Sequence, residues 1–129
     1  MAERILRDLG CRESELSILL VDDDEMQRLN REYLSRDRPT NVLAFAMREG
    51  KTKHPSPALL GDVVVSTETA QQEALRRGVT LEEEMALLLA HGILHLLGYD
   101  HEHAPEEAAQ MEAKEQEILT HLGFGNKGD

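Results

Sequence analysis

Three histidines in one short stretch, HGILHLLGYDH, are the residues of this chain best suited to chemistry. His91 and His95 are four residues apart, a spacing that places two side chains on one face of a helix. Gly98 lets the backbone turn after that helix, so that His101 can return toward the same point. Three neutral imidazoles on such a scaffold bind zinc and leave a fourth position for water or substrate. We therefore predict one Zn²⁺ ion held by His91, His95 and His101.

The spacing H-x-x-x-H-x-x-G-x-x-H differs from the metzincin peptidase motif at one position, where Gly92 replaces a glutamate. In those peptidases the glutamate is the general base for attack on a peptide carbonyl. The sequence therefore predicts a metzincin-like metal-binding helix and disfavours a metallopeptidase. Purely structural roles for the histidines are also disfavoured, because an apolar helix gains nothing from burying imidazoles that have no partner.

The helices and strands that must hold these histidines follow from apolar periodicity and capping residues. Thr80 and Glu83 form a capping box that begins the histidine helix. An earlier helix over 22–34 is expected to bury Met26, Leu29 and Tyr33 or its neighbours. Strands are expected at 16–21, 41–47 and 59–66, helices at 2–9, 22–34, 67–77, 80–97 and from 105 to about 122, and an exposed loop at 48–57. This order predicts an α+β fold in which helices pack on a small mixed sheet.

The composition of the chain sets its class. Its 129 residues fit a single domain, residues 1–129. Cys11 is the only cysteine, and the first thirty residues lack the pattern of a signal peptide, which predicts a cytoplasmic protein. The longest apolar run, 85–90, is far shorter than the roughly 18 residues that span a bilayer. No membrane role is therefore expected.

Charge is distributed unevenly along the chain. The formal net charge of −11 opposes general binding to phosphate. Half of the 14 Lys and Arg residues, however, lie between Arg28 and Lys53. This segment is either a local surface for a phosphate backbone or a set of solvated arginines around a loop, and charge alone does not separate the two.

The histidine motif resembles the zinc motif of the bacterial YbeY family of endoribonucleases and rRNA maturation factors. The stretches DRPTNVLAF (37–45) and LLGDVVVS (59–66), and an acidic helix with Met111 that ends at 122–124, agree in the same order. The resemblance implies a cytoplasmic, zinc-dependent, single-strand-specific endoribonuclease for 16S rRNA 3′ ends and ribosome quality control. It also implies ribosomal particles or ribosomal proteins as partners, with no DNA substrate and no membrane.

The chain departs from the family pattern at Leu34, where an arginine thought important for activity is common. Arg31, Arg36 and Arg38 are candidate substitutes, or they only decorate a loop. The departure leaves a second hypothesis open, a ribosome-assembly binding factor with a structural zinc and little catalysis. Family members also tend to carry an additional strand before the first helix, so the sheet is expected to be smaller here.

The general base and the nucleophile are not assigned by the sequence. Asp100 is expected to stabilise a turn or to orient a histidine. Glu84 lies on the helix face of His91 but about 10.5 Å away along the axis, too far to serve the same metal. A zinc-bound hydroxide and a ribose hydroxyl both stay open as nucleophiles. Met111 is expected to be a core residue.

Overall fold

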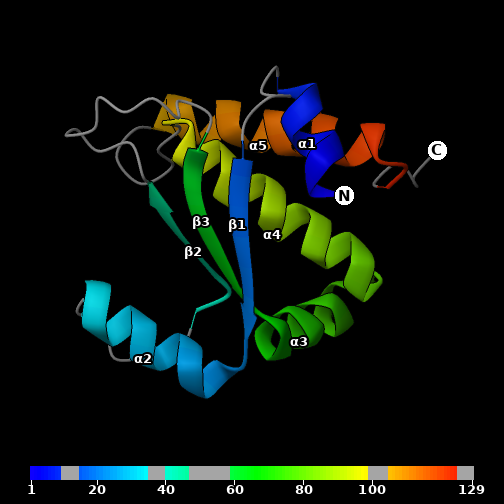
Figure 1. Cartoon of the computed structure of the whole chain (residues 1–129). Helices are drawn as coiled ribbons and strands as arrows, with labels where there is room; N and C mark the ends of the chain where they lie inside the picture. The colour runs from blue at the N-terminus through cyan, green and yellow to red at the C-terminus, as the bar shows by residue number, and fades with distance from the viewer. Residues whose placement is uncertain (10–14, 35–39, 47–58, 99–104, 125–129) are drawn as a thin grey trace.

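The computed structural model describes residues 1–9, 15–34, 40–46, 59–98 and 105–124. Their helices and strands are, in chain order, α1 (Ala2–Asp8), β1 (Glu15–Val21), α2 (Asp23–Leu34), β2 (Val42–Ala46), β3 (Leu59–Ser66), α3 (Thr67–Arg77), α4 (Leu81–Leu96) and α5 (Pro105–His121) (Figure 1). Every helix and strand expected from the sequence is present with boundaries close to those expected. The expected loop at 48–57 lies outside the described residues.

The sheet is mixed, with β3 between β1 and β2. β1 is parallel to β3 and places Leu19 opposite Val64, whereas β2 is antiparallel and places Leu43 opposite the same residue. Within the described ranges the sheet has three strands. The α+β architecture is confirmed.

Alternation along β3 divides the core into two layers, because successive side chains of a strand point to opposite faces. Val63 and Val65 pack in one cluster with Ile93 and Leu94 of α4. Val64 packs in a second cluster with residues of α2. Figure 1 shows α4 passing diagonally across the strands, and it contacts both β2 and β3. Helix α5 packs on α4 in turn.

The inner face of α2 differs in part from the expectation. Met26 is fully buried and Leu29 half-buried, as expected, but the Tyr33 side chain is 62% exposed. Its ring instead lies edge-on to Phe45, with ring centroids 5.4 Å apart. The buried stripe continues from Met26 to Asn30, which is 2% exposed, so the last turn of α2 carries Tyr33 to the surface.

Capping fixes the start of the histidine helix. The Thr80 hydroxyl accepts a hydrogen bond from the backbone N–H of Glu83 at 3.0 Å, as the capping box predicts. Gly78, with φ of 73°, ends α3 in the left-handed conformation that glycine favours. These two features set the direction in which α4 leaves α3. In the ranges described, no helix has both the length and the apolarity to cross a membrane.

Candidate metal centre

Helix α4 carries two of the three predicted zinc ligands, His91 and His95. Their spacing places both imidazoles on one face, while Ile93 and Leu94 between them are fully buried. The His91 side chain is 29% exposed, and His95 is exposed. The helix therefore holds the two rings at the edge of the core, where solvent and a substrate have access.

Glu115 of α5 fixes the orientation of His91. Its Oε2 lies 2.6 Å from Nδ1 of His91, and its side chain is only 11% exposed. A carboxylate accepts a hydrogen bond from Nδ1–H, which makes Nε2 the nitrogen with a lone pair for a metal. A carboxylate partner of this kind is typical of metal-binding histidines. His91 therefore keeps Nε2 available as a nitrogen donor of the kind that a metal ion accepts.

The third predicted ligand, His101, lies outside the described residues, as does Asp100. The last described residue before them is Gly98, whose φ of 108° turns the chain after α4 as the sequence predicts. Among the residues described, no group of three His, Cys, Asp or Glu side chains is placed to hold a metal. The zinc trio, and with it the metzincin-like part of the predicted fold, stays a prediction.

Gly92 lies where α4 packs tightly against β3. A Cβ added at this position would lie 2.8 Å from Cγ1 and 3.2 Å from Cγ2 of Val63. Any side chain there would push α4 away from the sheet, since packed interiors leave no such space. The position after the first histidine therefore faces the sheet, and it has no room for the glutamate of a metzincin.

A cavity of about 290 Å³ opens beside His91 between α3, α4, α5 and the start of β2. Its polar lining consists of Asn41, Glu73, Arg77, Glu84, His91 and Glu115. A second cavity, of about 260 Å³, shares His91 and Glu115 with the first and is also lined by Met111 and Glu112. Met111 is 1% exposed and belongs to the core cluster, as expected.

Glu84 lies in the first cavity, paired with a cation rather than with His91. Arg77 crosses from α3 to form this ion pair, in which the Glu84 side chain is 2% exposed and the Arg77 side chain 42% exposed. Asn41 Nδ2 donates to Glu73 Oε1 at 3.2 Å beside the pair. Burial raises the pKa of Glu84 and a hydrogen bond with Glu73 adds to the effect, while Arg77 opposes it.

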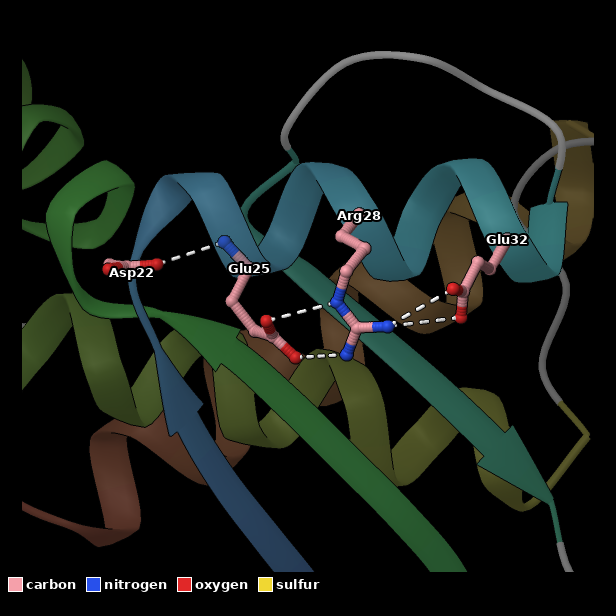
Figure 2. A network of polar contacts seen from close by, with 4 residues as sticks. All are labelled: Asp22, Glu25, Arg28 and Glu32. Carbon is pink, nitrogen blue, oxygen red and sulfur yellow. Dashed lines mark hydrogen bonds and ion pairs between the residues drawn. The ribbon is translucent and has the colours of Figure 1, made fainter.

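Arg28, the first residue of the predicted basic segment, is enclosed by carboxylates of its own helix. Figure 2 shows its guanidinium between Glu25 and Glu32, while Asp22 accepts the backbone N–H of Glu25 at 2.9 Å. The hydrogen bond from Arg28 lowers the pKa of Glu25. Arg28 is therefore neutralised locally. Arg31 is exposed on α2, and the remaining basic residues of the segment lie outside the described ranges.

Comparison with known proteins identifies the family of this site. The family model described as Endoribonuclease YbeY matches residues 1–123. The chain belongs to the YbeY family. It is 51% identical over 123 residues to the Endoribonuclease YbeY of Syntrophotalea carbinolica and 53% identical over 123 residues to that of Geobacter metallireducens. Each match covers 95% of this chain and 82% of the relative.

A solved structure shares the fold of this chain. The solution structure of TM1509 from Thermotoga maritima matches with a TM-score of 0.56 and 26% identity, over 98% of this chain and 85% of the other. The family model and the curated relatives confirm the family resemblance seen in the histidine motif and in the stretches around it.

Two residues of this YbeY site were missed in the sequence. The sequence predicts Arg77 only as the end of a helix, and nothing in its local sequence marks it as part of the cavity. Glu115 carried a usable signal, because it follows the buried Met111 by four residues and so shares the inner face of α5. A glutamate on the apolar face of a helix is expected to have a partner, here His91.

Proposed function

We propose that this YbeY-family endoribonuclease cleaves single-stranded RNA with one zinc ion held by His91, His95 and His101. The YbeY family is a family of metal-dependent nucleases; the identity of the metal and its three ligands is our proposal. The contact between His91 Nδ1 and Glu115 is the observation that carries it, because it leaves Nε2 available to a metal. When bound, zinc supplies an activated water and a Lewis acid for a phosphoryl oxygen.

In this proposal the described residues hold the metal ligands in place and are not assigned a proton transfer. Glu115 holds the ring of His91, and the capped helix α4 holds His91 and His95 at one face. Glu84 is occupied by Arg77 at the far end of the cavity. The proposal therefore assigns no general base to the described residues.

The proposed substrate is the 3′ end of 16S rRNA, with ribosomal particles or ribosomal proteins as partners and the cytoplasm as the location. The order of the YbeY-like motifs supports this proposal. A single cysteine is in keeping with a reducing compartment.

Cleavage of a single-stranded rRNA 3′-end substrate tests the proposal. We expect purified parent protein to cut it with one metal ion per chain, and His95→Ala to lose both the metal and the cleavage. His121→Ala, an exposed histidine at the end of α5, is the matched control and keeps both. Normal cleavage by a metal-free His95→Ala protein would refute the proposal. A folded, metallated parent that binds ribosomal particles without cleaving RNA would favour the assembly factor with a structural zinc.

A further inference from the structure

Arg77 is the cation that the described residues contribute to the cavity beside His91. Its partner Glu84 is inside the protein, at 2% exposure, whereas Arg77 itself is 42% exposed. A guanidinium carries five N–H donors in a fixed fork, and one carboxylate accepts only part of them. The buried carboxylate thus anchors an arginine that lines the cavity and has more donors than this carboxylate can accept.

The position of Arg77 suits a phosphate that flanks the scissile phosphate, and not the scissile phosphate itself. Glu84 and His91 are seven residues apart on α4, which is about 10.5 Å along the helix axis. Arg77 contacts Glu84 and lines the same cavity as His91. An RNA strand that reacts at His91 would therefore bring a flanking phosphate, rather than the scissile one, to the guanidinium.

The other carboxylates of the cavity are directed at protein donors. Glu73 accepts from Asn41 Nδ2 at 3.2 Å, and Glu115 is held against His91 at 2.6 Å. Because these carboxylates interact with groups of the protein, they repel a phosphate in the cavity less than free carboxylates would. An arginine is suited to such a place, because it binds phosphate through directed hydrogen bonds as well as through charge.

We infer that Arg77 binds an RNA phosphate next to the scissile one and that Glu84 is the residue that positions it. The inference rests on the proposed function, since it takes RNA as the ligand of the cavity. It also supplies, from α3, a phosphate-binding cation in a chain that has Leu34 at the end of α2.

The test compares Arg77→Gln with Arg76→Gln, which removes the same charge from the same last turn of α3 outside the cavity. The double variant Arg77→Gln/Glu84→Gln leaves no buried carboxylate without its partner and so protects the fold. The quantities to measure are KM and kcat on labelled single-stranded RNA across salt concentrations. We also measure fluorescence anisotropy of that RNA with His95→Ala as the background, where it stays uncut.

For both variants that lack Arg77 we expect KM to rise about tenfold with kcat changed by less than about twofold. The slope of log affinity against log salt should fall by about 0.7, the contribution of one phosphate on a single strand. Arg76→Gln should match the parent. A double variant with the KM and salt slope of the parent would show that the ion pair only joins α3 to α4. If the parent does not cleave, the proposed function fails, and the anisotropy measurements still decide the role of Arg77.

Discussion

Two arginines of this protein pair with glutamate in different surroundings. Arg28 lies on α2 between Glu25 and Glu32 of the same helix, and these side chains are 40–48% exposed (Figure 2). Arg77 pairs across two helices with Glu84, which is 2% exposed and borders the cavity of His91. The first pair follows from local spacing along one helix. The second exists only after α3 and α4 pack, and packing is what brings a cation to the site.

The comparison predicts that contacts around α4 matter more than contacts within α2. Gly92→Ala should have the largest effect, lowering the free energy of unfolding by about 3 kcal/mol, because its Cβ meets Val63 at 2.8 Å. Chemical denaturation measures the loss. Alanine in a free helix would instead gain about 0.5–1 kcal/mol over glycine, so even the sign is informative.

The double variant Gly92→Ala/Val63→Ala tests the cause of that loss. Truncating Val63 removes both methyl groups near the new Cβ, so part of the stability should return relative to the sum of the single changes. Strictly additive changes would show that contact with Val63 is not the reason for glycine at position 92.

Glu115→Gln should lower zinc affinity about 10–100-fold, which corresponds to about 1.4–2.7 kcal/mol. The glutamine amide still accepts a hydrogen bond from His91. It lacks the negative charge of the carboxylate, which makes the histidine a stronger metal ligand. Competition with a chelator measures the affinity. Glu117→Gln, an exposed position on the same helix, is the control and should leave zinc affinity unchanged. Equal zinc affinities for the two variants would show that Glu115 does not contribute to zinc binding.

Arg77→Gln should cost about 2 kcal/mol of stability, because it leaves Glu84 buried without its cation. Arg28→Gln should change stability by less than about 0.5 kcal/mol, since both of its partners are exposed. Thermal and denaturant unfolding of the two variants gives the difference directly. Similar losses would break the comparison between the two arginines.

The smallest expected effect is the pH dependence of stability, which differs between the Arg77–Glu84 pair and the Arg28–Glu25 pair. The pKa of Glu84 is raised above its ordinary value of 4.5, so its ionisation opposes folding as pH rises from that value through the folded pKa. The parent should therefore lose stability relative to Glu84→Gln over that interval. The pKa of Glu25 is lowered, so its stabilisation is present above 4.5 and is lost as pH falls through the folded pKa. Unfolding curves of Glu84→Gln and Glu25→Gln against pH should diverge from the parent with opposite signs.

Much of the fold could be predicted because its signals are local. The cap at Thr80, the glycine after α3 and the apolar run of β3 each mark a boundary within a few residues of sequence. Tyr33 is the exception, because it is exposed where burial is expected. Which turn of a helix is the last to contact the sheet depends on packing and not on periodicity.

The candidate site was predicted only where its residues are neighbours in sequence. His91 and His95 share a helix face by spacing alone, whereas Glu115 reaches His91 across 24 positions. Arg77 enters the cavity by the packing of α3 on α4, so a count of basic residues along the chain pointed instead to Arg28 and the segment after it. Conversely, Gly92 was recognised as the loss of a protease base, but its contact with Val63 required the structure.

Zinc-edge X-ray absorption of the purified, metal-loaded protein tests most directly the claim that His91, His95 and His101 hold one zinc ion. We predict the multiple-scattering pattern of three imidazoles, with nitrogen and oxygen neighbours at about 2.0–2.1 Å and no sulfur. His101→Ala should reduce the imidazole contribution to two. A sulfur neighbour at about 2.3 Å, or a spectrum that His101→Ala leaves unchanged, would contradict the account.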